Sequence, residues 1–263
     1  MSENAVGALE AEVAHATALI LSLTPEEWDA PSGCADWRVQ DVVCHMASVF
    51  HTIADPSTIE GGSSEDAEEN AEVPVQARRA WTTDQVIAEY AEWSAKGVAA
   101  LTALQDPPMA DVVVPLGNLG AHPLHILANA IVFDHYCHLR HDIGFALPRA
   151  AGLPQDEAPL AATLEWMLAG VPQMCAPGLA GVEPVAVNLE FSGPGGGSYV
   201  LAPSEPGELW TVTPGSAAGA ATVTTSVHDF ISWGTKRADW RTMTVADNLT
   251  PSAAAVIDAL NVI

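Results

Sequence analysis

The pattern of apolar residues changes once along this chain, near residue 178, and this change constrains the fold more than any other feature. Before it, apolar residues recur every three or four positions, which is typical of amphipathic helices. After it, short stretches such as VAVNLEF and ATVTTSV alternate and are rich in β-branched residues, which is typical of strands. The sequence therefore predicts an α+β protein with a helical domain over 1–178 and a small α+β domain with an antiparallel sheet over 182–263.

The expected helices of the first domain cover five ranges: 6–22, 39–52, 83–104, 122–143 and 157–175. Thr24 followed by Pro25 predicts the start of a further short helix, and Thr83 is expected to cap the helix that follows it. Residues 53–77 contain Pro, Gly and Ser and the acidic run EDAEENAE, which predict a solvated, mobile loop. In the second domain, SVHDFISWGT and PSAAAVIDALNVI predict two helices near the end of the chain.

The charge of the chain excludes several classes of partner. Lys and Arg together number 9 against 33 for Asp and Glu, a formal net charge of -24. Nucleic-acid binding needs basic patches, and an anionic membrane surface attracts basic segments, so neither partner is expected. The chain starts without a secretory pattern, and no apolar run approaches the roughly 18 residues that span a bilayer. We therefore expect a cytoplasmic protein whose four cysteines are free thiols.

Five of the nine histidines lie in one predicted helix, together with two aspartates. Asp134 and His138 are four residues apart, so they share a helix face and can chelate one cation. His141 lies on nearly the same side, whereas His135 and Asp142 are expected to point elsewhere. Pairs with this spacing also occur by chance as solvent-facing hydrogen bonds, which leaves a purely structural role open.

His45 is the best candidate for a third ligand. It interrupts the apolar stretch VVCHMA, where a histidine is either a satisfied core residue or a metal ligand. Periodicity alone favours the core, and the Asp134–His138 pair makes the two interpretations about equally good. Two histidines and one carboxylate with open coordination positions suit Zn(II) or non-haem Fe(II). The neighbouring Cys44, like Cys137, is interpreted as packing.

Three segments carry a resemblance to a known family. ADWRVQDVVCHMASVF resembles the W-x-V-x-D-V-V-x-H-L segment of the DinB-like, mycothiol-dependent maleylpyruvate isomerase family, and FDHYCHLRHDI resembles its second metal segment. The end of the chain resembles its small C-terminal domain, which is related to sterol-carrier folds. The resemblance implies a DinB-like four-helix bundle with His45, Asp134 and His138 as metal ligands. The characterised isomerases have Glu where this chain has the shorter Asp134.

The resemblance also implies a chemistry. It predicts a divalent metal, zinc first and iron or nickel as alternatives, with mycothiol as cosubstrate. The thiolate would attack a small, electrophilic or anionic substrate in an isomerase or S-transferase reaction. Arg237 would hold the substrate, with Arg78 or Arg79 as further matches, and a solvated surface position is the alternative for each arginine. A thiol-independent hydrolase or non-haem iron enzyme, and a non-catalytic metal- or ligand-binding module, remain alternatives, and a homodimer remains open.

Overall fold

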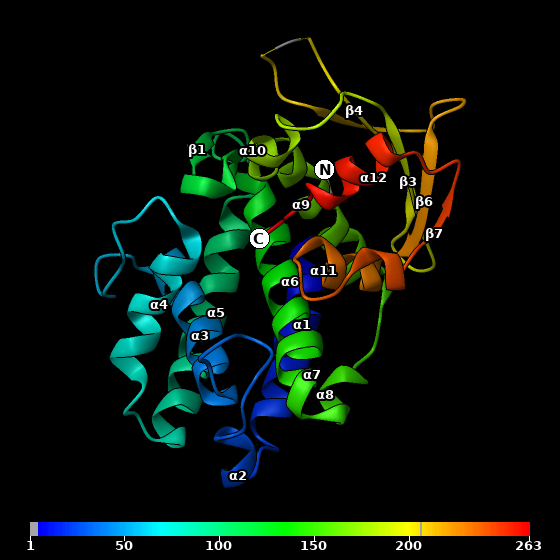
Figure 1. The fold of residues 1–263 in the computed structure, drawn as a ribbon. Coiled ribbons are helices and arrows are strands. Elements are labelled where there is room, and N and C mark those ends of the chain that lie inside the picture. Colours follow the sequence, from blue (N-terminus) through cyan, green and yellow to red (C-terminus); the bar gives the residue numbers. More distant parts are fainter. Residues whose placement is uncertain (1–4, 206) are drawn as a thin grey trace. The chain divides into compact units, whose positions relative to one another are not determined.

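The computed structural model describes residues 5–205 and 207–263 and divides into two compact units between Pro154 and Gln155 (Figure 1). This division lies earlier than the boundary near 176–183 that the sequence suggests. The last long helix, α9 (Glu157–Met174), belongs to the second unit, because it contacts α11 and β5 of that unit. The change of apolar pattern therefore marks the first strand of the second unit and not its first residue.

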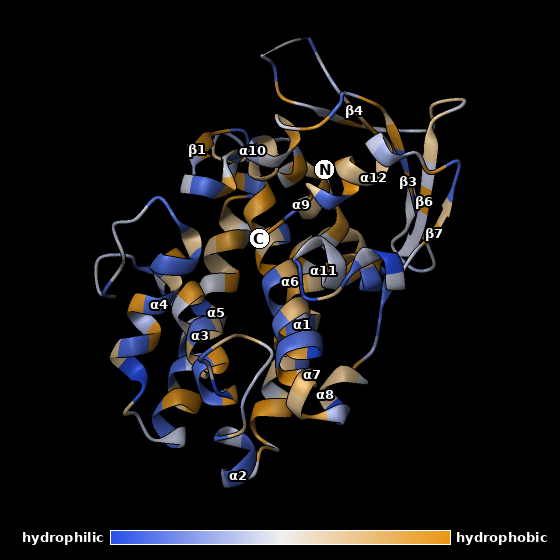
Figure 2. Ribbon diagram, in the orientation of Figure 1, coloured by the Kyte–Doolittle hydropathy of each residue, from blue (hydrophilic) through white to orange (hydrophobic). Residues whose placement is uncertain are grey.

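The first unit is helical, as predicted. Its elements are α1 Ala5–Ile20, α2 Pro25–Trp28, α3 Val39–Ala54, α4 Ala67–Arg78, α5 Thr83–Ala103, β1 Val113–Pro115, η1 Gly117–Leu119, β2 Ala121–Pro123, η2 Leu124–Ile126, α6 Leu127–Cys137, η3 His138–Ile143, α7 Gly144–Ala146 and α8 Pro148–Ala151. The long helices form the bundle, with α3 packed on α5 and α1 packed on α6. Hydrophobic and hydrophilic residues alternate along these helices (Figure 2), and the hydrophobic residues form the buried core.

Threonine side chains cap the starts of α2 and α5. The hydroxyl of Thr24 accepts a hydrogen bond from the backbone N–H of Glu27, whose carboxylate accepts one from the backbone N–H of Thr24. This capping box, with Pro25 in the first turn, confirms the predicted start of α2. In α5 the cap is Thr82, one residue earlier than expected, because the side chain of Gln85 completes the same reciprocal pair with Thr82.

The acidic segment predicted as a loop over 53–77 contains a helix. Asp66 is the N-cap of α4 and accepts hydrogen bonds from the backbone N–H groups of Glu68 and Glu69. Those two acids lie in the first turn, where negative charge favours a helix through its dipole. The run EDAEENAE is therefore a helix start, and the expectation of a loop was wrong for residues 67–77.

The predicted helix over 122–143 is broken into several elements. His122 lies in the short strand β2, paired with Val114 of β1, and the α-helix α6 begins only at Leu127. At His138 the helix widens into the π-helical segment η3, which continues to Ile143. Single π-turns inside helices occur frequently at functional sites, because they turn side chains out of the ordinary α-helical register.

The second unit is a five-stranded sheet with helices. After α9, its elements are α10 Ala176–Leu179, β3 Val187–Ser192, β4 Gly197–Ala202, β5 Thr211–Pro214, β6 Ala221–Ser226, α11 Val227–Gly234, η4 Trp240–Thr242, β7 Val245–Asp247 and α12 Pro251–Asp258. The strand order is β5-β4-β3-β6-β7, and neighbours are antiparallel except for the central parallel pair β3–β6. Both helices predicted near the end of the chain are present as α11 and α12.

Alternation in the central strands builds the core of this sheet. Val187, Leu189 and Phe191 of β3 are buried, while Glu190 between them is half-buried on the opposite face. Leu189 is opposite Tyr199 of β4 and Val223 of β6, so the apolar sets coincide in register. Across the described part of the chain, none of the helices has the length and apolarity that a membrane span requires.

Candidate metal centre

The site begins with the buried helix α3. Its first turn is held by Asp41, whose carboxylate accepts a 2.9 Å hydrogen bond from the backbone N–H of Arg38. Nearly every residue from Val39 to His51 is buried, so the helix presents apolar side chains to the bundle in almost every direction. His45 is only 9% exposed. An imidazole so placed needs a polar partner within the bundle.

That partner is Asp134 of α6. Nε2 of His45 lies 2.9 Å from Oδ1 of Asp134, and Nε2 of His138 lies 3.5 Å from the same oxygen. One donor atom from each of the three residues lies within 4.8 Å of the other two. The structure thus brings together the three residues that the sequence singles out, from two helices that are about 90 residues apart in the chain.

The donor set fits a divalent metal ion. Donor atoms in a tetrahedral zinc site lie about 2.0–2.2 Å from the ion and therefore roughly 3.3–3.5 Å from one another, close to the spacings around Asp134. The second carboxylate oxygen of Asp134, Oδ2, is buried, and Nδ1 of His135 lies 3.3 Å from it. A buried carboxylate beside two imidazole nitrogens is the chemistry of a zinc or iron(II) site with open positions.

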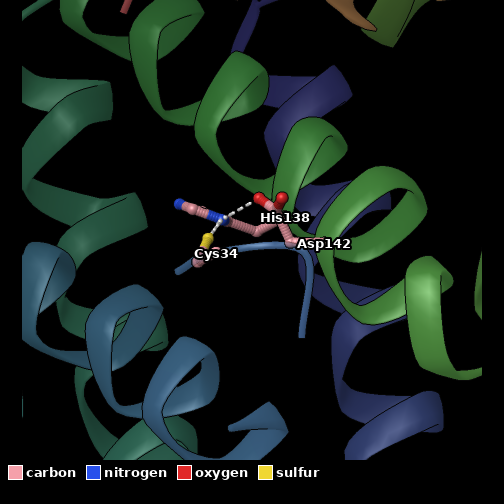
Figure 3. Close-up of side chains that lie close together, drawn as sticks. All are labelled: Cys34, His138 and Asp142. Carbon is pink, nitrogen blue, oxygen red and sulfur yellow. Dashed lines mark hydrogen bonds and ion pairs between the residues drawn. The ribbon is translucent and has the colours of Figure 1, made fainter. Parts of the chain in front are cut away.

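Asp142 orients the second histidine. Its Oδ2 lies 2.8 Å from Nδ1 of His138, and Asp142 is fully buried (Figure 3). A carboxylate on one ring nitrogen keeps the proton there and leaves the lone pair of the other nitrogen for a metal. The expectation that Asp142 points elsewhere was wrong. The signal was present in the sequence, because His138 and Asp142 have the same four-residue spacing as Asp134 and His138.

The electrostatics of the pair follow from this arrangement. Burial alone would raise the pKa of Asp134, but the adjacent His45 and His138 hold it well below its usual range. Burial alone would lower the pKa of His138, but Asp134 and then Asp142 hold it well above its usual range. Asp134 and His138 therefore each favour the charged form of the other. A divalent ion bound at Nε2 of His138 would compete with a proton for that nitrogen.

Trp37 forms one wall of the site. Its ring centroid lies 5.3 Å from that of His45 and 6.5 Å from that of His138. The indole Nε1–H donates a 2.6 Å hydrogen bond to Glu72 of α4, which also accepts from Arg79. Helix α4, which the sequence did not predict, therefore anchors Trp37 beside the candidate ligands.

The segment before α3 also places a thiol beside the site. Sγ of Cys34 lies 3.9 Å from Nδ1 of His138, and Figure 3 shows this contact and the one from Asp142 converging on the same ring nitrogen. The backbone N–H of Gly33 donates a 2.9 Å hydrogen bond to the carbonyl oxygen of Asp142. A side chain at Gly33 would lie about 2.9 Å from the carboxylate of Asp142, so the glycine permits this close approach.

The arginines differ in their surroundings. Arg78 is buried and donates to both carboxylate oxygens of Glu89 and to the carbonyl of Pro74, which makes it a structural residue. Arg79 is about one-third exposed and pairs with Glu72 at 3.0 Å. Arg237 is exposed in the turn after α11 of the second unit. Its role in substrate binding stays a prediction.

One remaining histidine of the predicted 122–143 helix touches this cluster, because Nδ1 of His135 lies 3.3 Å from Oδ2 of Asp134. Nε2 of His122 lies 2.8 Å from the carbonyl of Leu119, and Nδ1 of His125 lies 2.8 Å from that of Ala110. His135 is fully buried against Phe50, and His141 packs near the ring of Tyr136. Cys44 and Cys137 are buried, in agreement with their interpretation as packing residues.

Comparison with known proteins places the chain in a family. Residues 9–144, just over half of the chain, match the family described as mycothiol maleylpyruvate isomerase N-terminal domain. No curated protein matches the sequence.

Two solved structures share the fold. They are a mycothiol-dependent maleylpyruvate isomerase (TM-score 0.57) and a histidine-to-alanine mutant of that enzyme (TM-score 0.54). Each is 12% identical in sequence, and each match covers 96% of this chain and 95% of the other. With the helical unit and its cluster in view, the family match leads to one conclusion: this chain belongs to the mycothiol maleylpyruvate isomerase N-terminal domain family.

Proposed function

We propose that this protein is a metal-dependent enzyme that uses a low-molecular-weight thiol, mycothiol, to isomerise a small electrophilic substrate or to form a thioether with it. His45, Asp134 and His138 would hold the ion, with zinc as the first candidate. The observation that carries the proposal is the convergence of these three donors from α3, α6 and the start of η3, with Asp142 orienting the last of them. Family membership supplies the thiol.

The residues of this chain have separate tasks. Asp142 keeps a proton of His138 on Nδ1, so that Nε2, on the side of Asp134, would offer its lone pair to a metal ion. Trp37 covers one side of the imidazoles and excludes water there. A divalent metal bound by these ligands supplies a Lewis acid that stabilises a thiolate and polarises an electrophile. Arg237 is proposed to bind an anionic group of the substrate.

The first test measures metal content in wild-type protein beside His138→Ala and His125→Gln. We expect about one zinc, nickel or iron ion per chain in wild type and in His125→Gln, and its loss in His138→Ala. His125→Gln is the matched control, because that histidine bonds the carbonyl of Ala110 outside the cluster. A wild-type protein that takes up no ion after incubation with Zn(II) or Fe(II) would contradict the proposal.

The second test separates a thiol-dependent enzyme from a thiol-independent one. Cobalt(II)-loaded protein carrying Cys34→Ser is mixed with mycothiol, so that any thiolate-to-cobalt absorption comes from the cosubstrate. We expect this absorption to appear, and turnover of maleylpyruvate or a related electrophile to depend on mycothiol. If the absorption spectrum of the bound cobalt does not change when mycothiol is added, the result would favour a hydrolase or an iron enzyme with the same three ligands.

A further inference from the structure

His138 belongs to two sets of possible metal donors. The first is the set already described, with His45 and Asp134 on the Nε2 side of the ring. The second consists of Cys34, His138 and Asp142, whose donor atoms also lie within 4.8 Å of one another. In this second set the imidazole offers Nδ1, which lies 3.9 Å from the Cys34 sulfur and 2.8 Å from the Asp142 carboxylate (Figure 3).

The second set has the spacing of a metal site. With zinc–sulfur and zinc–nitrogen bonds of about 2.3 and 2.0 Å, sulfur and nitrogen lie roughly 3.6 Å apart around a tetrahedral ion, and nitrogen and oxygen roughly 3.3 Å. The observed separations, 3.9 Å and 2.8 Å, differ from these by about 0.5 Å or less.

The chemistry of the two sets differs. The first has two nitrogens and one oxygen, whereas the second has a sulfur, a nitrogen and an oxygen. A thiolate ligand favours a soft divalent ion such as cadmium over a harder one. Cys34 is partly exposed, while the other three cysteines, Cys44, Cys137 and Cys175, are buried. An ion from solvent therefore reaches one thiol of this chain in preference to the others.

One histidine cannot serve both sets as a neutral ligand. A neutral imidazole has a proton on one ring nitrogen and a lone pair on the other. Nε2 can bind an ion only while Nδ1 carries the proton donated to Asp142. If Nδ1 binds an ion, the proton moves to Nε2 and the first set loses His138. As a neutral ligand, His138 therefore serves one set at a time, because only an imidazolate without either ring proton can bridge two ions.

We propose that Cys34, His138 and Asp142 form a second, mutually exclusive metal site that takes a thiophilic divalent ion and displaces the ion of the first set. When the new ion replaces that of the first set, the ring proton of His138 moves from Nδ1 to the vacated Nε2. The Cys34 thiol becomes a metal-bound thiolate and releases its proton to solvent, with no change of oxidation state. The site would make the protein sensitive to inhibition by soft metal ions. This inference needs no mycothiol and stands apart from the thiol chemistry proposed above.

The test uses cadmium(II) alone, read by thiolate-to-cadmium absorption in the ultraviolet and by the number of ions per chain. In Asp134→Asn, which disables the first set, we expect one cadmium ion with one thiolate band. Adding Cys34→Ser to that variant should abolish the band and the bound ion. Cys175→Ser is the control and should change neither, because that thiol is buried in the second unit. If Asp134→Asn fails to fold, His45→Gln disables the same set.

Exclusion is tested in wild-type protein preloaded with zinc. We expect the cadmium–thiolate band to grow only as zinc is released, one ion for one ion, so that the total stays at one ion per chain. Two ions bound together, a band that persists in Cys34→Ser, or no band in either first-set variant would overturn the proposal. If no ion binds to His45, Asp134 and His138 but the Cys34–cadmium band is normal, the result contradicts only the proposed enzyme function.

Discussion

The two units bury different kinds of polar residue. In the described part of the first unit, the buried set includes Glu12, Asp41, Arg78, Glu89, Arg140, Asp142 and four histidines. In the described part of the second unit, the buried polar residues are Thr163, Asn188, Thr225 and Ser232, which are all neutral. The charged pair of Arg241 and Asp258 there is about half exposed. Among the described residues, only the helical unit buries acidic side chains, arginines and histidines.

This difference follows from architecture and points to the site of chemistry. Buried charge is costly unless it is paired, and facing helices can bring complementary groups together from distant parts of the chain. Glu12 of α1 and Arg140 of η3 form such a pair, with both side chains fully buried and two hydrogen bonds of 2.6 and 3.0 Å. Arg140 lies between His138 and Asp142 in η3, so this pair also fixes the candidate site.

The largest effect is expected from breaking that pair. Glu12→Gln leaves the buried Arg140 without a counter-charge and should lower the free energy of unfolding by about 3–5 kcal/mol. The matched change in the second unit, Asp258→Asn, removes a half-exposed partner and should cost less than about 1 kcal/mol. Urea denaturation measures both. Equal losses would show that burial of charge does not distinguish the two units.

A smaller effect is expected from the residue that orients His138. Asp142→Asn should weaken metal binding by about 10- to 100-fold, because the amide cannot hold the imidazole proton as a carboxylate does. The number of ions bound at saturation should stay the same. Competition with a chelator of known affinity gives the dissociation constant of the metal ion. If the variant binds the ion as tightly as wild type does, Asp142 does not contribute to the metal site.

Metal binding should stabilise the helical unit more than the second unit. An ion present at about 100 times its dissociation constant stabilises the form that binds it by about 2.7 kcal/mol. Hydrogen exchange followed by mass spectrometry should therefore show slower exchange in α3, α6 and η3, with little change in β3 and β6. Removing the ion with a chelator should restore the faster exchange in these helices. Equal protection of the sheet would place the bound ion outside the helical unit.

The smallest effect concerns a surface pair of the first unit. The hydrogen bond from Arg149 and, second, that from the backbone N–H of Thr24 lower the pKa of Glu27 from 4.5 to about 2. Because the folded-state pKa is depressed, the stabilising contribution is present above about pH 4.5 and is lost as the pH falls towards 2. In Arg149→Gln, an NMR titration should return the pKa of Glu27 towards 4.5. An unchanged pKa would mean that the cap at Thr24, and not the arginine, causes the shift.

Much of the fold follows from local pattern. The helical periodicity of α1, α3 and α5, the capping box at Thr24 and the alternation in β3 and β6 are properties of neighbouring residues. The chain was accordingly predictable as a helical part followed by strands. Two predictions were wrong. A loop was predicted around Asp66 from composition alone, although Asp66 caps a helix. One helix was predicted over 122–143 from its periodicity, although this range contains a strand and a π-helix.

For the site, the sequence by itself determined the candidates His45, Asp134 and His138, because helix spacing and an odd histidine in an apolar run are local signals. Even Asp142 was within reach of the same spacing rule. Only the tertiary structure decided that Trp37 lies against the histidines, that Cys34 contacts His138, and that Arg78 is a structural residue. These contacts join residues far apart in the chain, or depend on the path of a loop. No periodicity encodes them, because packing between helices selects them.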